Sequence, residues 1–351
     1  EQSMNSPYYF APAAEPYHEV ITNFQREFQE TIGKNHARYF DKEGWFYFTK
    51  ERFDLFYPSY GDTYPTYNGA IGMTYEQGGS GRAGLGVITA NGDTLTLKDR
   101  IAHHRTTGLS TVEMAAAHAD RLNIEFRKFY GSKNYRYKSY VLNGSEDKIR
   151  SLTNLLDKHE IEYGFARASS AKGYRYQTGK NGSISLSEKS LVISSDQKKG
   201  TLVKVLFEPD ASLSDSLTYD ITAWSLPHAY GLDALASTTA ISAGNNSGSG
   251  EQIQNDIADD AYAYLVSWKG MADARFLADL LKEEIRVRYS HKPFRIDGKK
   301  YDRGTLIITR SDNSKKANFV STIRKFAEKH GRKVDAASTG FVESGKDFGS
   351  G

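Results

Sequence analysis

Alternation of strand and helix patterns in the second half of the sequence is the feature that most constrains the fold. Short apolar runs precede amphipathic helix patterns in "YKSYVLNGSEDKIRSLTNLLDKHEIEYGFA", "AYLVSWKGMADARFLADLLKEEIRVRYS" and "TLIITRSDNSKKANFVSTIRKFAEKHGRKVDA". Such alternation predicts a mostly parallel sheet covered by helices. We therefore expect an α/β domain of repeated strand-helix-strand units over residues 133–351. The first two units align with each other, which favours an internal duplication over about 135–240 and 255–351, joined by the connector Ala240–Gln254.

The first part of the sequence has a less regular pattern. Apolar residues recur at helical spacing between Glu15 and Phe40, which predicts an amphipathic helix there. A segment rich in Tyr and Phe and interrupted by Pro and Gly follows, and we expect it to be a shaped loop that leads into a strand at Ala70–Glu76. A hairpin turning at Asn91-Gly92 and a helix over about Thr111–Phe129 complete the prediction.

A change of composition at Arg127–Lys138, "RKFYGSKNYRYK", marks the predicted boundary between two domains, residues 1–132 and 133–351. Interleaved cations and aromatic residues can bind single-stranded nucleic acid, but a solvated connector has the same composition, and we interpret the stretch as a linker.

The composition excludes several function classes. A formal net charge of +3, with both signs mixed along the chain, gives no indication of a polyanionic partner such as nucleic acid. We expect no membrane-spanning segment, because no apolar run approaches the ~20 residues that a spanning helix needs. Cysteine is absent, so any metal site must use His, Asp or Glu.

A glycine-rich run follows Glu76 in "GAIGMTYEQGGSGRAGLGV", and Gly79, Gly81 and Gly84 form the spacing G-x-G-x-x-G. A dinucleotide-binding turn needs a helix directly after these glycines, because the helix amides bind the pyrophosphate. Strand-forming residues and a hairpin turn follow instead, in "LGVITANGDTLTL". We therefore interpret the run as a tight turn beside a carboxylate.

The stretch around Glu76 resembles the strand that carries the catalytic glutamate in the zinc carboxypeptidase family, the carboxypeptidase A-like metallopeptidases. In that family a strand of the form small-Ile-x-x-Thr-aromatic-Glu precedes a turn containing Gly-Arg-x-Gly. The matching residues here are Ile71, Thr74, Tyr75, Glu76, Gly81, Arg82 and Gly84. The aromatic loop before them and "TLKDRIAHHRTTGLSTVEMAA" after them are similar to family segments as well, so the resemblance covers roughly residues 1–130.

This resemblance implies that residues 1–132 are the C-terminal part of a catalytic domain with a partial, carboxypeptidase-like mixed sheet and helices. Glu76 would be the general base that activates a zinc-bound water and then protonates the leaving amine. Either Tyr60 or Tyr57 would bind the peptide or peptide-like substrate, with Arg82 beside it. Family members are commonly exported, so the resemblance also implies a periplasmic or extracellular location.

The zinc ligands that the resemblance implies are missing from the expected places. Family members bind zinc with His-x-x-Glu and a further His before the catalytic glutamate, whereas only His18 and His36 precede Glu76 here, and we expect both at the surface. "EQSMNSPYYF" is similar to the family segment after the last zinc histidine, so the metal ligands are expected upstream of Glu1. Residues 1–351 alone would then contain no metal ligand and be inactive, and zinc would bind the longer parent.

Other candidate residues have simpler interpretations. His159 and Glu162 have His-x-x-Glu spacing but follow Glu76, and adjacent His103 and His104 rarely chelate one ion. The stretch Asp215–Ala234, "DSLTYDITAWSLPHAYGLDA", is either a peptide- or glycan-binding loop or a buried aromatic turn. A second hypothesis for the whole chain is a non-catalytic peptide- or glycan-binding protein on a peptidase scaffold that uses the aromatic loop.

Overall fold

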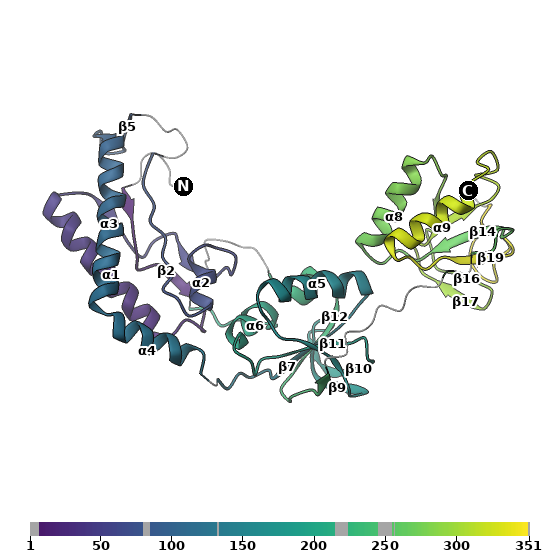
Figure 1. Ribbon diagram of the computed structural model, residues 1–351, viewed down its shortest axis with the longest axis horizontal. Helices are drawn as coiled ribbons and strands as arrows, with labels where there is room; N and C mark the ends of the chain where they lie inside the picture. The colour runs from purple at the N-terminus through teal and green to yellow at the C-terminus, as the bar shows by residue number, and fades with distance from the viewer. Residues whose placement is uncertain are drawn as a thin grey trace. The chain divides into compact units, whose positions relative to one another are not determined.

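The computed structural model describes residues 7–79, 85–131, 133–214, 224–244, 255 and 257–349. Helices and strands are mixed along the chain, which confirms the general α/β class (Figure 1). The chain divides into two compact units. Unit 1 comprises Glu1–Leu142, Asp157–Ser187 and Leu191–Ala243, and unit 2 comprises Asn143–Leu156, Glu188–Ser190 and Gly244–Gly351.

The elements are as follows. The helices are α1 (Asn23–Glu43), α2 (Thr63–Tyr67), α3 (Leu97–Ala117), α4 (Ala119–Phe129), α5 (Glu146–Lys158), α6 (Gly200–Phe207), α7 (Leu226–Ala229), α8 (Met271–Lys282) and α9 (Phe319–His330). The strands are β1 (Tyr8–Tyr9), β2 (Ala14–Tyr17), β3 (Tyr47–Phe48), β4 (Asp54–Leu55), β5 (Gly86–Ile88), β6 (Thr94–Thr96), β7 (Ser139–Asn143), β8 (Gly164–Ala166), β9 (Ser170–Arg175), β10 (Lys180–Ser185), β11 (Leu191–Ser194), β12 (Asp233–Ser237), β13 (Ala243–Gly244), β14 (Ala263–Val266), β15 (Arg288–Tyr289), β16 (Phe294–Ile296), β17 (Lys299–Tyr301), β18 (Leu306–Thr309) and β19 (Asp335–Ala337).

Helix α1 begins later than the spacing of its apolar residues predicts. The expected helix starts at Glu15, but β2 occupies this stretch and pairs with β4. Thr22 then caps the helix, because its side chain and that of Gln25 each accept a hydrogen bond from the other's backbone. Gly44 ends the helix in the left-handed conformation, with φ of 70°.

Helix α3 also differs from the prediction, which placed a single helix over Thr111–Phe129. The helix starts at Leu97, where Thr96 and Asp99 form a capping box. It ends at Ala117, and α4 follows after His118. α1 and α3 lie side by side in unit 1 (Figure 1). The predicted hairpin before α3 is confirmed, since β5 and β6 pair antiparallel and Gly92 has φ of 84°.

The predicted strand Ala70–Glu76 is wrong, because among the described residues this segment pairs with the rest of the chain only through a bridge between Tyr9 and Glu76. Side chains of α1 take the place of a neighbouring strand. The Gln25 amide donates to the Ala70 carbonyl at 2.8 Å, and the Gln29 amide donates to the Gly72 carbonyl at 2.9 Å. A Cβ at Gly72 would lie 1.7 Å from the Asp62 carbonyl oxygen, so only glycine fits where the chain passes α2.

The predicted mostly parallel sheets are also wrong. In the seven-stranded sheet, of order β10-β9-β12-β7-β11-β8-β13, β11 is antiparallel to both β7 and β8. In the four-stranded sheet, of order β15-β18-β14-β19, β18 is antiparallel to β14 and β15, and β14 is antiparallel to β19. The strands of each strand-helix-strand unit are indeed parallel, but an antiparallel strand lies between them. A helix is about 10 Å wide and strands are about 4.8 Å apart, so one connecting helix leaves room for that inserted strand.

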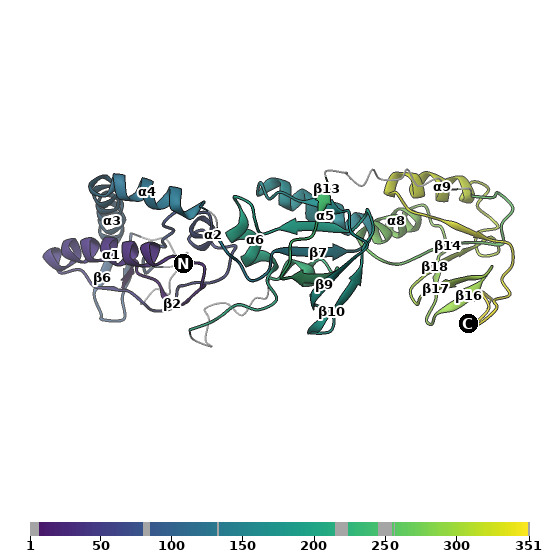
Figure 2. The same cartoon turned by 90° about the horizontal axis from the view of Figure 1, so that it is seen from below.

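Unit 2 has an apolar layer on each face of its four-stranded sheet. Alternate residues of β14 point to opposite faces, so Tyr264 and Val266 pack with residues of α8 and α9. Ala263 and Leu265 contact the other layer, which includes residues of the β16–β17 hairpin. Figure 2 shows α8 and α9 on one side of β14 and β18, and the hairpin on the other. The sheet therefore packs on both faces within unit 2.

The segment that was predicted to be a linker, Arg127–Lys138, forms hydrogen bonds along its length. Lys133 and Tyr135 both contact the Thr201 hydroxyl at 2.7 Å, and the Lys138 amide donates to the Ser237 carbonyl. The connector Ala240–Gln254 lies mostly outside the described residues. No helix in the described part of the chain has the length and apolar character needed to cross a membrane.

Candidate functional site

Glu76 is held by its backbone beside β1. The Tyr9 amide donates to the Glu76 carbonyl at 2.7 Å, and the Glu76 amide donates to the Tyr9 carbonyl at 3.1 Å. This two-bond bridge fixes the direction in which the Glu76 side chain leaves the chain. The side chain is half-buried and lines an open pocket.

The pocket next to Glu76 has a volume of about 620 Å³. One wall is the segment from Tyr75 to Gly78, and the other is α3. The residues of α3 in this wall lie at intervals of three and four, as expected for one helical face: Leu97, Arg100, Ile101, His104 and Arg105. The pocket therefore combines a carboxylate, two guanidinium groups and an imidazole with an apolar strip.

Tyr8 orients the imidazole of His104. The Tyr8 hydroxyl lies 2.9 Å from Nδ1 of His104 and 2.8 Å from the Thr107 hydroxyl. Tyr8 is fully buried, and burial raises its pKa, so the hydroxyl keeps its proton at neutral pH. Burial lowers the pKa of His104 while Glu76 acts in the opposite direction, so at neutral pH His104 is mainly uncharged.

His103 faces away from the pocket, into the layer between α1 and α3. Its Nδ1 lies 2.5 Å from the Gln77 side-chain oxygen, and because that oxygen can only accept, Nδ1 carries the proton. The ring packs against Trp45 and Phe40, with ring centroids 4.5 Å and 5.4 Å away. Burial lowers the pKa of His103 to about 4. His103 thus holds Gln77, the residue after Glu76.

His36 continues this buried layer behind Tyr75. Thr111 donates its proton to the Thr107 carbonyl, so it accepts from the Tyr75 hydroxyl, 2.6 Å away. The Tyr75 oxygen then accepts from Nε2 of His36 at 3.0 Å, and the Ser110 hydroxyl donates to Nδ1 at 2.7 Å. In this arrangement Nε2 of His36 donates and Nδ1 accepts, so the ring carries one proton and is neutral. Burial lowers the pKa of His36 to about 4, in agreement.

Acidification is expected to destabilise unit 1 through His36. The pKa of His36 is about 4 in the folded protein and 6.5 for an exposed ring, so between these pH values only the unfolded chain binds the proton. The stabilisation is complete above pH 6.5 and is lost as the pH falls toward 4. His36 alone should contribute a loss of about 2 kcal/mol to urea unfolding between about pH 7 and about pH 5, and His103, whose pKa is also about 4, should add a similar amount.

His36→Gln should make this loss smaller by about 2 kcal/mol and leave the similar contribution of His103, whereas His291→Gln, at an exposed position of unit 2, should leave the whole loss unchanged. Equal pH dependence in the two variants would show that other groups are responsible.

The other residues that the resemblance singles out do not line this pocket. Tyr57 and Tyr60 contact each other, with ring centroids 5.2 Å apart, and Tyr57 also contacts Trp224 at 5.9 Å. Arg82 lies outside the described residues, as does the part of the stretch Asp215–Ala234 that precedes Trp224. Glu76 is thus the one predicted site residue that the described structure places in the pocket.

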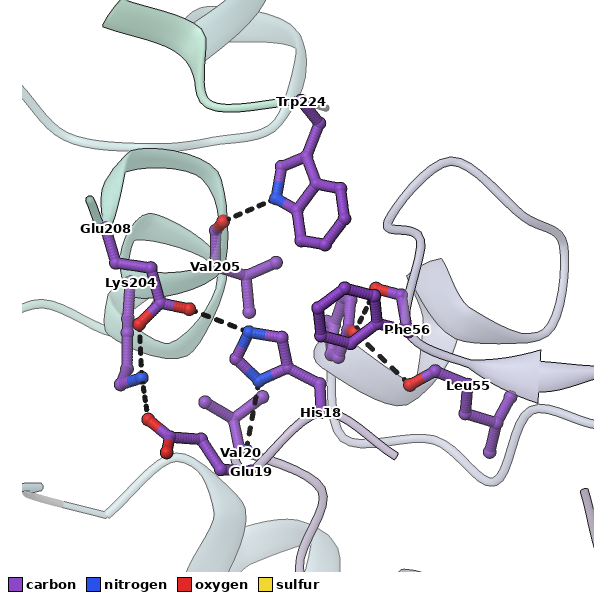
Figure 3. A network of polar contacts seen from close by, with 10 residues as sticks. His18, Glu19, Val20, Leu55, Phe56, Lys204, Val205, Glu208 and Trp224 are labelled. Atoms are coloured by element: carbon purple, nitrogen blue, oxygen red, sulfur yellow. Dashed lines mark hydrogen bonds and ion pairs between the residues drawn. The ribbon is translucent and has the colours of Figure 1, made fainter. Parts of the chain in front are cut away.

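His18 is fully buried, contrary to the prediction that it lies at the surface, and the same correction applies to His36. Nδ1 of His18 accepts from the Val20 amide, so Nε2 carries the proton and donates to Glu208 at 2.7 Å (Figure 3). Lys204 donates to the other Glu208 oxygen at 2.5 Å and also bonds Glu19. Burial acts to lower the pKa of Lys204, but these hydrogen bonds outweigh it and raise the pKa. The surface prediction failed because Glu208 is 190 residues away in the sequence.

The described residues include no group of three or more His, Cys, Asp or Glu side chains placed to hold a metal ion. His159, in the His-x-x-Glu pair, instead contacts the Tyr64 hydroxyl through Nδ1 at 2.7 Å, and Glu162 is exposed. The residues that the structure describes therefore do not fit a zinc site by themselves.

Sequence reasoning missed the α3 wall of the pocket. Arg100, His104 and Arg105 lie before the predicted helix start at Thr111. The sequence Thr96-Leu97-Lys98-Asp99 has the spacing of a capping box, and it could have placed the helix start correctly.

Comparison of the chain with protein-family models, with curated proteins and with solved structures found no match.

Proposed function

We propose that the Glu76 pocket belongs to a zinc-dependent, metallocarboxypeptidase-like hydrolase that cleaves peptide or amide bonds. The observation that carries the proposal is the position of Glu76. The residue that matches the family's catalytic glutamate projects from a bridged backbone into an open pocket of about 620 Å³. A pocket of this volume is in the range that holds small organic ligands.

Glu76 would act as a proton carrier at this site. Its carboxylate takes a proton from the attacking water as the water oxygen bonds to the carbonyl carbon. It then gives the proton to the amide nitrogen as the carbon–nitrogen bond breaks. Zinc would supply Lewis-acid chemistry at this site only if ligands outside the described residues held it there. The proposal assigns the metal to no described residue, because the described residues do not form a ligand set.

The exposed face of α3 supports the idea that a further part of the catalytic domain covers this helix. Four large apolar side chains along α3 are exposed: Leu97, Ile101, Leu109 and Val112. Soluble proteins rarely leave a row of this kind uncovered. We propose that the missing catalytic segment of the parent protein packs over Leu109 and Val112 and leaves the pocket at Leu97 and Ile101 open, and that residues 1–351 alone are inactive.

The two sheets support the proposed internal duplication. Within β7-α5-β8 and β11-α6-β12, the spatial order is β8-β11-β7-β12. Within β14-α8-β15 and β18-α9-β19, the order is β15-β18-β14-β19. If the four strands of each set are numbered in sequence order, both sheets have the spatial order second, third, first, fourth. Both are split β-α-β arrangements. We propose that they are two copies of one accessory unit.

A second candidate function is non-catalytic binding of a peptide or glycan. The observation that favours it is the aromatic cluster of Tyr57, Tyr60 and Trp224, whose side chains are all partly exposed. Aromatic clusters of this kind are common in binding sites.

The experiment that separates the two candidates is a hydrolysis assay on the longest natural polypeptide containing residues 1–351. Short peptides are incubated with the zinc-loaded protein and with the same protein after chelation, and released amino acids are quantified. We expect cleavage that is lost on chelation and restored by zinc. Peptide binding without cleavage at saturating zinc would favour the non-catalytic candidate.

A further inference from the structure

The charged groups of the Glu76 pocket are unevenly distributed between its two walls. The α3 wall carries Arg100, Arg105 and the ionisable ring of His104, while the opposite wall carries Glu76. The pocket-lining charge is thus positive on the helix side. Carboxylates are bound strongly by guanidinium groups, through hydrogen bonds that the charges strengthen.

The geometry of α3 divides this wall into two rows. Leu97, Ile101 and Arg105 follow each other at intervals of four, so the apolar row ends in a cation. Arg100 and His104 form the adjacent row. Arg100 reaches across to the segment after Glu76, where a Cβ added at Gly79 would lie 3.1 Å from its Nη1 atom. A ligand that contacts both rows would need an aliphatic stem and an anionic end.

Protonation of His104 would add a positive charge to the α3 wall of the pocket. Its Nδ1 is engaged by Tyr8, and in the described part of the chain no hydrogen bond to its Nε2 is formed. The charged or titratable groups around the ring are Tyr8, Tyr75, Glu76, His103, Arg100 and Arg105. The buried tyrosines stay neutral at neutral pH, so the neighbouring charges are one carboxylate and two guanidinium groups.

We propose that this pocket binds the acidic side chain of a peptide, with Arg105, Arg100 and His104 as the residues that select it. The inference rests on the proposed function and names the substrate class: peptides with a glutamate or aspartate side chain next to the cleaved bond. A glutamate side chain has the required form, because its methylene groups can lie on Leu97 and Ile101 while the carboxylate meets the cations. The negative charge of Glu76 repels the ligand carboxylate, which therefore lies at the α3 wall.

The test compares two end-blocked pentapeptides that differ only in a central Glu or Gln. Both are titrated into residues 1–351 by calorimetry, so no hydrolysis is needed. The Glu peptide should bind about tenfold more tightly than its Gln counterpart. Arg105→Gln and Arg100→Gln should each reduce this preference severalfold, while Arg127→Gln, an exposed arginine on α4, should leave it unchanged. Thermal unfolding of each variant verifies that it is folded.

A pH series tests the part assigned to His104. Burial lowers the pKa of His104 below that of an exposed ring, so the ring gains its charge mainly in acidic solution, where the Glu side chain is still ionised down to about pH 4.3. The preference for Glu should therefore increase in the wild type as the pH falls from about 7.5 toward about 4.5, and His104→Gln should abolish the increase.

Equal affinity for the two peptides, no measurable binding of either, or a preference that survives both arginine substitutions would overturn the inference. These results are separate from the hydrolysis assay. Cleavage of neutral peptides without a preference for Glu would leave the proposed function intact and remove only the inference. Preference for Glu without cleavage at saturating zinc would remove the proposed function.

Discussion

Replacement of Glu208 by leucine is expected to destabilise unit 1 by about 3–5 kcal/mol. The Glu208 side chain is 7% exposed and accepts hydrogen bonds from His18, which is fully buried, and from Lys204, which is 14% exposed. Leucine removes the acceptor for both donors. The Nε2 proton of His18 then has no partner in an apolar environment, and Lys204 keeps only Glu19. The loss should be visible in urea unfolding followed by tryptophan fluorescence, to which Trp224 contributes from beside α6, where it donates to the Val205 carbonyl.

A double-mutant cycle identifies the source of this effect. Because His18→Phe removes the donor, combining it with Glu208→Leu should cost less than the sum of the two single changes. Glu162→Leu, at an exposed position, is the matched control and should change the unfolding free energy little. A loss below about 1 kcal/mol for Glu208→Leu would mean that the network contributes no more than a surface ion pair.

Local signals predicted some features of the fold well. The β5–β6 hairpin follows from Asn91-Gly92 between two strand patterns, and only short-range geometry is involved. The helix starts at α1 and α3 were misplaced although Thr22 and Thr96 open capping boxes that are visible in the sequence. Apolar spacing extends across β2 and does not mark a helix start, whereas the capping residues do.

Long-range features could not be predicted from the sequence. The structure has a strand, a helix and a strand in the order that each sequence pattern predicts. The pattern does not show that a third strand lies between the two strands of such a unit. β18 pairs with β14 although the two strands are about 40 positions apart in the sequence. This pairing depends on both strands packing against the same helices, which is a long-range property of the fold. The same limit explains His18, whose partner Glu208 directly follows α6. Similarly, Ala70–Glu76 has strand composition, yet Gln25 and Gln29 of α1 bind its carbonyls.

The candidate site was predicted in part. Glu76 was singled out by its sequence context, and the structure places it in a pocket. The α3 wall was missed because its residues are separated from Glu76 by the hairpin and belong to a helix whose start was misplaced. The buried histidines behind the wall were missed because burial is a property of packing. Nothing in a single sequence distinguishes His36 or His103 from a surface histidine.

Glu76→Gln is expected to reduce kcat/KM for peptide hydrolysis by about 10²–10⁴-fold in the zinc-loaded parent protein. Glutamine has nearly the same shape but cannot take a proton from water at neutral pH. The backbone bridge to Tyr9 does not depend on the side chain, so the variant should fold as the wild type does. Its thermal unfolding should therefore be close to that of the wild type.

The ratio of kcat/KM between Glu76→Gln and Glu162→Gln, measured in the same zinc-loaded polypeptide, tests the central claim most directly. Both variants make the same chemical change, but Glu162 is exposed and does not line the pocket. If Glu76 carries the proton during hydrolysis, Glu162→Gln retains wild-type turnover and Glu76→Gln is slower by about 10²–10⁴-fold. Equal turnover of the two variants would contradict the assignment of Glu76 as the catalytic group.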